Sequence, residues 1–211
     1  MAHRPSQRPA NVAYYWLNRD REIERVRTRQ AKTVAFLRDV RRSPCMDCAR
    51  MFEPHQMDFD HTDGANKRFR LTSGAAMLKS SPALLAEIQG CDIVCANCHR
   101  VRTWLRHASR EQQLGDSPDL VRKRGQWRAQ AKLLDNLRDV ACADCAQRFP
   151  PCAMDFDHRD PATKVQAVTR MIGRAGTARI LAEVAKCDIV CANCHRLRTF
   201  ERRMAGRQAR E

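Results

Sequence analysis

The sequence predicts an α+β protein made of two small tandem domains, each stapled by a metal site of four cysteines, with a helical N-terminal extension. Three observations lead to this prediction. A block of sequence occurs twice, each copy carries two C-x-x-C pairs, and a basic stretch at 13–40, free of proline and glycine, precedes the first copy. A chain of 211 residues can form one large domain or two small ones, and the duplication favours two.

The duplication is visible in two motifs. MDFDH occupies residues 57–61 and 154–158, and CDIVCANCHR occupies residues 91–100 and 187–196. The first motif recurs at an offset of 97 and the second at 96, so the second copy has lost one residue between them. Self-similarity of this kind indicates a repeated structural unit. We therefore predict a basic helical N-terminal segment at 1–40, the first domain at 41–107, a linker at 108–125, and the second domain with a preceding helix at 126–211.

The secondary structure follows from periodicity and from capping residues. Residues 13–40 show the apolar spacing of a helix, and residues 127–140 form a shorter version before the second copy. In the first copy, Ser81 is a favourable N-cap and Gly90 a favourable stop for another helix. The other elements predicted in this copy are a strand at 57–60, a strand at 93–94 and a helix at 100–107.

The cysteine spacing predicts one structural zinc ion in each copy. A C-x-x-C pair presents two thiolates to one ion from a single turn, and two such pairs complete a tetrahedral site. The first site would consist of Cys45, Cys48, Cys95 and Cys98, and the second of Cys142, Cys145, Cys191 and Cys194. Free buried thiols and redox dithiols are the alternatives. Cys91 and Cys187 would be fifth thiols, for which a closed site has no place, so we predict small buried residues there.

A zinc staple alone does not require the acidic and histidine residues that accompany it. Asp58 and Asp60 alternate onto one side of the predicted strand, and paired carboxylates suit a hard divalent cation. His61 follows at the strand end, and His99 directly follows a predicted zinc ligand. The same pattern recurs as Asp155, Asp157, His158 and His195. Phosphodiester hydrolysis by a base of near-neutral pKa and a metal ion fits this set, whereas polar surface residues or structural histidines are the alternative.

These residues also carry a family resemblance. DFDH followed by CANCHR, with a preceding C-x-x-C, resembles the HNH endonucleases of the ββα-metal fold, especially the small zinc-containing HNH proteins of bacteriophages. The resemblance covers about residues 45–107 and 142–204. It implies that His61 and His158 are general bases. It further implies that Asp60, His99, Asp157 and His195 bind a catalytic metal, supported by Asp58 and Asp155. Magnesium, manganese, nickel or zinc would suit such a site.

The sequence departs from the family at the middle asparagine. This residue usually lies just ahead of the second strand, where the chain has Gly90 and Lys186. Asn97 and Asn193 occur in both copies, but inside the second cysteine pair. The role of the family's asparagine therefore stays unassigned.

The net charge of +15 points to a polyanionic partner, and nucleic acid is favoured over an acidic membrane. Five arginines between residues 19 and 29 either contact DNA or form a solvated face. The chain shows neither a secretory signal nor an apolar run of membrane-spanning length, so we expect a cytoplasmic protein of a bacterium or a phage-infected host.

We predict a metal-dependent endonuclease that nicks or cleaves double-stranded DNA. One alternative is a non-catalytic zinc-ribbon module that binds DNA or RNA. Another is a structural adaptor in a phage packaging or repair assembly. The duplicated aspartates and histidines favour the enzyme, since binding alone needs only the cysteines and arginines.

Overall fold

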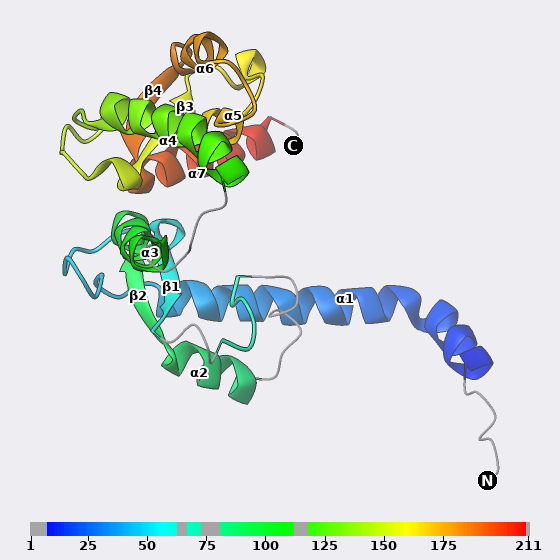
Figure 1. The fold of residues 1–211 in the computed structure, drawn as a ribbon. Helices are drawn as coiled ribbons and strands as arrows, with labels where there is room; N and C mark the ends of the chain where they lie inside the picture. The colour runs from blue at the N-terminus through cyan, green and yellow to red at the C-terminus, as the bar shows by residue number, and fades with distance from the viewer. Residues whose placement is uncertain (1–7, 63–66, 73–80, 112–117, 210–211) are drawn as a thin grey trace. The chain divides into compact units, whose positions relative to one another are not determined.

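The computed structural model describes residues 8–62, 67–72, 81–111 and 118–209 (Figure 1). The α-helices are α1 (Arg8–Val40), α2 (Ser81–Gln89), α3 (Ala96–Glu111), α4 (Pro118–Arg138), α5 (Val168–Met171), α6 (Thr177–Val184) and α7 (Ala192–Gln208). The strands are β1 (Met57–His61), β2 (Cys91–Cys95), β3 (Met154–His158) and β4 (Cys187–Cys191). Short 3-10 helices are η1 (Pro54–Gln56), η4 (Pro151–Ala153) and η5 (Pro161–Thr163). The strands form two sheets, β1–β2 and β3–β4, which confirms the α+β class.

The chain divides into two compact units that do not follow the repeat. The first unit is Met1–Ser43 with Phe59–Asp92, and the second is Pro44–Asp58 with Ile93–Glu211. The predicted first domain at 41–107 therefore contributes to both units. The second unit contains the whole second copy together with all four predicted zinc ligands of the first.

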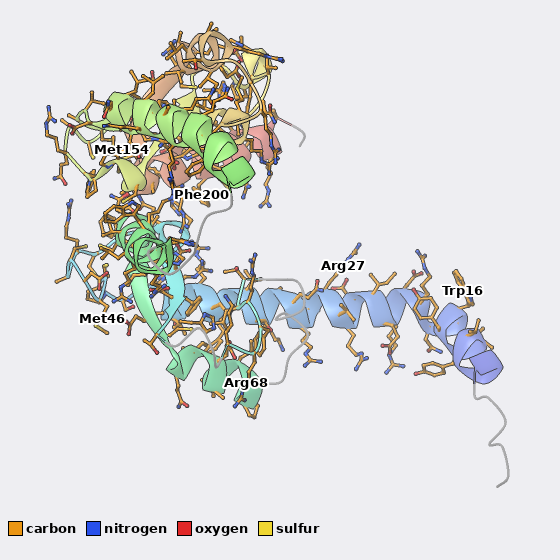
Figure 2. All side chains as sticks on the ribbon, in the orientation of Figure 1. Trp16, Arg27, Met46, Arg68, Met154 and Phe200 are labelled. Atoms are coloured by element: carbon orange, nitrogen blue, oxygen red, sulfur yellow. The ribbon has the colours of Figure 1, made fainter. Side chains whose placement is uncertain are left out.

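The basic N-terminal segment is helical, as predicted, and α1 begins earlier than expected, at Arg8. Among the described side chains of α1, the buried ones lie in its C-terminal part. Leu37 packs there with Leu71 and Leu84, against Phe59 and Phe69. Figure 2 shows Trp16 and Arg27 projecting from the rest of α1, and Trp16 is 65% exposed.

The second copy builds its core as two clusters, one near each end of a two-stranded sheet. Antiparallel pairing of β3 and β4 sets Met154 opposite Cys191 and His158 opposite Cys187. Met154 and Val190 pack against the cysteines at one end. A larger cluster contains Leu134, Val168, Met171, Ile180 and Cys187. Because α4 and α6 supply part of this core, the helices fix the strand end that carries His158.

Helix occupies both ends of the predicted linker at 108–125. α3 continues to Glu111 and α4 begins at Pro118, whereas residues 112–117 lie outside the described part of the chain. α3 and α4 also contain the helices predicted at 100–107 and 127–140. No helix among the described residues is long and apolar enough to cross a membrane.

Candidate functional site

Two clusters of four cysteines are confirmed. Cys45, Cys48, Cys95 and Cys98 form the first, and Cys142, Cys145, Cys191 and Cys194 form the second. Within each cluster the sulfur atoms all lie within 4.8 Å of one another. A tetrahedral ion with metal–sulfur bonds of about 2.3 Å requires sulfurs about 3.8 Å apart, so the donors fit such an ion. Each cluster could therefore hold one metal ion.

The local backbone of each cluster stabilises an ionised cysteine sulfur. Ala49 has a left-handed φ of 55°, which closes the turn after Cys48 and returns the Ala49 N–H to the Cys45 carbonyl. Burial opposes ionisation of Cys45, but N–H groups of Cys48, Cys95 and Asp47 bond its sulfur and lower its pKa to about 7. In the second copy, Ala146 has a φ of 56° and the pKa of Cys142 is likewise lowered to about 7. A thiolate is the form that binds metal.

The extra cysteines lie outside both clusters. The Cys91 thiol donates to the Glu87 carbonyl at 3.2 Å, and the Cys187 thiol to the Glu183 carbonyl at 3.4 Å. Burial, followed by the neighbouring glutamate charge, raises the pKa of both thiols to about 11. Such thiols are poor metal ligands at neutral pH.

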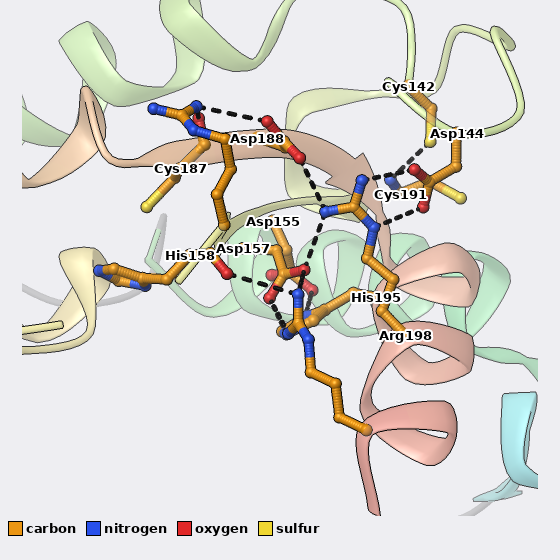
Figure 3. A network of polar contacts seen from close by, with 12 residues as sticks. Cys142, Asp144, Asp155, Asp157, His158, Cys187, Asp188, Cys191, His195 and Arg198 are labelled. Carbon is orange, nitrogen blue, oxygen red and sulfur yellow. Dashed lines mark hydrogen bonds and ion pairs between the residues drawn. The ribbon is translucent and has the colours of Figure 1, made fainter. Parts of the chain in front are cut away.

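In the second copy, the three predicted catalytic residues and the supporting Asp155 surround one cavity. This cavity has a volume of about 270 Å³, and Asp155, Asp157, His158 and His195 line it. Lys164 and Arg202 add positive charge to its wall. Figure 3 shows the two aspartates and His195 close together, with His158 to one side.

His195 is held between the two aspartates of this cavity. Its Nδ1 lies 2.8 Å from Asp155 Oδ2, and its Nε2 lies 3.5 Å from Asp157 Oδ1. Burial alone would raise the pKa of Asp155, but the hydrogen bond from His195 and the charge of Arg100 lower it. Asp155 is thus a carboxylate that accepts from Nδ1–H, and Nε2 of the same ring faces Asp157. A carboxylate behind the histidine is the usual support of a metal-binding imidazole.

Asp157 is buried and also contacts two arginines. Arg198 Nη1 donates to Oδ2 at 3.0 Å, and the Arg202 guanidinium donates to both oxygens at 2.8 Å. Burial would raise the pKa of Asp157, but these two arginines lower it. Since each carboxylate oxygen has two lone-pair positions, Oδ1 keeps one position beside His195. The pair of Asp157 and His195 therefore offers two donors for a divalent ion.

His158 has a buried partner that sequence reasoning missed. Its Nε2 lies 2.8 Å from Glu183 Oε1, and both side chains are about 95% buried or more. Glu183 also accepts from Lys186 and from the N–H groups of Val165 and Gln166. Lys186 first, and then His158 and these N–H groups, lower the Glu183 pKa to about 2 against the effect of burial. The sequence did contain a sign of this partner, because the glutamate is part of the repeat. Glu87 stands four residues before Cys91, and Glu183 stands four residues before Cys187.

The first copy repeats these contacts within each unit. In the first unit, His61 Nε2 lies 2.6 Å from Glu87 Oε1, and Asp60 is buried. In the second unit, His99 Nδ1 lies 2.7 Å from Asp58 Oδ2. The glutamate of this copy has no lysine like Lys186, because Gly90 occupies that position.

Asn97 and Asn193 join the two copies inside the second unit. The Asn97 N–H donates to Asn193 Oδ1 at 3.3 Å, and the Asn193 N–H donates to Asn97 Oδ1 at 3.1 Å. Both asparagines are buried. Gln56 adds a bond from Nε2 to the Asn193 carbonyl at 3.0 Å. The asparagines of the repeated CANCHR motif thus link the two copies by hydrogen bonds.

Comparison with known proteins does not extend this picture. No model of a protein family matches the chain, and neither a curated protein nor a solved structure shows significant similarity to it.

Proposed function

We propose that the protein is a metal-dependent DNA endonuclease of the HNH type, with a structural zinc ion in each four-cysteine cluster. The observation that carries this proposal is the cavity of the second copy, where His158, Asp157 and His195 meet beside positive charge. The second cysteine cluster adjoins this cavity, because Cys191 and Cys194 flank the start of the helix that carries His195. The repeated D-x-D-H motifs extend the assignment to the first copy.

The tautomer of His158 makes it suitable as the base. Glu183 remains a carboxylate at neutral pH, because its pKa is about 2. His158 Nε2 must therefore carry the proton of their hydrogen bond, and Nδ1 keeps the lone pair. This nitrogen would take a proton from the attacking water, and Glu183 would stabilise the resulting imidazolium. In the first copy, Glu87 supports His61 in the same way.

Asp157 and His195 Nε2 would hold the catalytic metal, whose charge would offset the charge that develops on the scissile phosphate and the leaving oxygen. Asp155 would keep His195 in the tautomer that binds metal. Lys164 lies in the same wall and would attract a phosphate oxygen. Lys164 would thus help to place a DNA strand beside His158.

Cleavage of supercoiled plasmid tests the proposal directly. Purified protein should nick or linearise the plasmid with added Mg²⁺ or Mn²⁺, and a chelator too weak to strip the cysteine clusters should stop the reaction. The Asp157→Ala, Asp60→Ala double variant, purified identically, controls for contaminating nuclease. If this variant cleaves as fast as the wild type, the activity does not belong to these sites.

DNA affinity should depend steeply on salt. Arginine and lysine contacts to phosphate release counterions, so the affinity should fall by about tenfold or more between roughly 50 and 200 mM salt. Fluorescence anisotropy with a labelled duplex and the catalytically inactive double variant would measure this slope. An affinity that is constant over this range would contradict a phosphate-binding surface.

Binding without cleavage is a second candidate function, and the arginines on Asp157 favour it. They occupy positions that a metal ion would otherwise use. The endonuclease proposal predicts that Arg202→Gln tightens Mn²⁺ binding roughly threefold to tenfold, because a competing cation is removed. Titration of Mn²⁺ followed by electron paramagnetic resonance would measure this change. A protein that binds DNA while neither form binds Mn²⁺ would establish the binding module instead.

A further inference from the structure

Arg196 reaches from the second copy to an aspartate of the first. Its Nη1 and Nη2 donate to Asp58 Oδ1 at 2.9 Å and Oδ2 at 2.6 Å. The same Oδ2 lies 2.7 Å from His99 Nδ1. Asp58 thus connects an arginine of one copy with the predicted metal-binding histidine of the other.

The opposite contact has the same form. Arg100 of the first copy donates from Nη1 to Asp155 Oδ1 at 2.6 Å and from Nη2 to Oδ2 at 2.8 Å. Asp155 Oδ2 lies 2.8 Å from His195 Nδ1. Both aspartates are largely buried, with side chains 17% and 13% exposed. Each copy therefore donates an equivalent arginine to an aspartate of the other copy.

We propose that Arg100 and Arg196 are positioning residues that act across the copies, each fixing the aspartate that orients the metal-binding histidine of the other copy. The inference rests on the proposed function, because it gives the histidines their metal-binding role. A guanidinium that holds both carboxylate oxygens sets the plane of the carboxylate, which a single-point contact does not. The carboxylate plane in turn sets the direction of the imidazole.

Helix geometry explains why the arginine serves the other copy. Arg196 directly follows His195 in α7, and Arg100 directly follows His99 in α3. Consecutive residues on a helix point in different directions, about 100° apart. When the histidine turns toward the aspartate of its own copy, the arginine is directed away from it. In both copies this direction leads to the other copy's aspartate.

The shared carboxylate oxygen supports the assignment. Asp58 Oδ2 accepts from Arg196 Nη2 and also faces His99 Nδ1. A carboxylate that is paired with a guanidinium acts as an acceptor, so it favours the tautomer with the proton on Nδ1 and leaves Nε2 as the metal-binding nitrogen. Without the guanidinium, the carboxylate is free to rotate and this preference weakens.

The test isolates one metal site at a time. His195→Ala removes a metal ligand of the second copy and leaves only the first site, and His99→Ala leaves only the second. Mn²⁺ binding to protein with zinc-loaded cysteine clusters is then followed by electron paramagnetic resonance, with and without Arg196→Gln. We expect a loss of roughly tenfold in affinity at the first site, as for other residues that support a ligand, and a much smaller loss at the second. Arg100→Gln should give the reverse pattern.

Two further variants keep the result interpretable. Arg196→Lys preserves the charge but holds only one oxygen, so it should show the same crossed loss to a lesser degree. Arg50→Gln is the matched control, because Arg50 also donates across the copies, to Gln147 at 2.8 Å, without reaching an aspartate of the site. In nicking assays of the isolated sites, kcat should fall while the KM for DNA changes by less than about twofold, since positioning affects the reaction step.

Equal losses at both sites, or a larger loss at the arginine's own site, would overturn the inference. If wild-type protein binds Mn²⁺ and cleaves DNA but the crossed pattern is absent, the proposed function stands and only the positioning role fails. If wild-type protein binds no Mn²⁺ beyond the clusters, both proposals fail.

Discussion

His158→Ala and His61→Ala should each convert a protein that linearises plasmid into one that only nicks it. Each site carries one base and should cut one strand, so loss of one base leaves one strand intact. Removal of a general base reduces the rate by about 10²–10⁴-fold, which exceeds the effect expected at any supporting residue. Plasmid cleavage resolved into supercoiled, nicked and linear forms over time would measure both rates.

The controls for this result are in the same chain. The double variant should be inactive yet bind duplex DNA with an affinity close to that of the wild type. His107→Ala removes an exposed histidine of α3 and should preserve cleavage. If neither His61→Ala nor His158→Ala slows cleavage, the histidines are not the bases.

A division of labour between the copies would give a different product pattern. The copies differ where Lys186 pairs with Glu183 at 2.7 Å, since Gly90 leaves Glu87 without this cation. The lysine shares the charge of Glu183, so the glutamates that support His158 and His61 do not have the same surroundings. If His158→Ala leaves all products unchanged while His61→Ala abolishes cleavage, only the first copy cuts.

Loss of one cysteine cluster should destabilise both copies. Zinc binding by four thiolates contributes on the order of 10 kcal/mol in small domains, which is comparable with the whole stability of such a domain. Cys191→Ser should lower zinc content from about two ions per chain to about one, as each tetrahedral site holds one ion. Elemental analysis and thermal unfolding would measure the two effects.

Loss of the second cluster should also destabilise the first copy, because Asn97 of the first copy contacts the second cluster. Asn97 follows Cys95 by two residues, and its side chain hydrogen bonds the sulfur of Cys191 in addition to its contact with Asn193. The first copy should therefore lose protection from hydrogen exchange in Cys191→Ser as well. Cys152→Ser changes a thiol outside both clusters and is the control. Folded, active protein without zinc would contradict this role of the clusters.

The sequence predicted those features that depend on short spacings. Cys45 and Cys48 are close in sequence and so must be close in space, and strand alternation directs Asp155 and Asp157 into one cavity. Residues that meet only through tertiary packing were not predictable. Glu183 lies 25 residues from His158 and sits on a helix whose apolar positions gave the stronger signal. For the same reason, the sequence of α1 did not show which of its residues are buried. Leu37 is buried because it packs with Leu71 and Leu84, which are distant in sequence.

Contacts between the copies were the least accessible to sequence analysis. Arg100 and Arg196 end the repeated CDIVCANCHR motif, but no local pattern in a chain with 39 basic residues shows that each contacts the other copy. Asn97 and Asn193 were recognised as repeated, but a repeated residue can serve its own copy or the other. Only the three-dimensional arrangement separates these cases.

The exchange of equivalent bonds between Asn97 and Asn193 has a consequence for oligomeric state. When residue i of one copy contacts residue j of the other and the reverse also holds, the surface is self-complementary, as in an isologous dimer. A chain with a single copy would present that surface unpaired and would dimerise through it at sufficient concentration. When both copies belong to one chain, each copy meets the other at an effective concentration of roughly millimolar. The pairing of the copies then no longer depends on how much protein the cell contains.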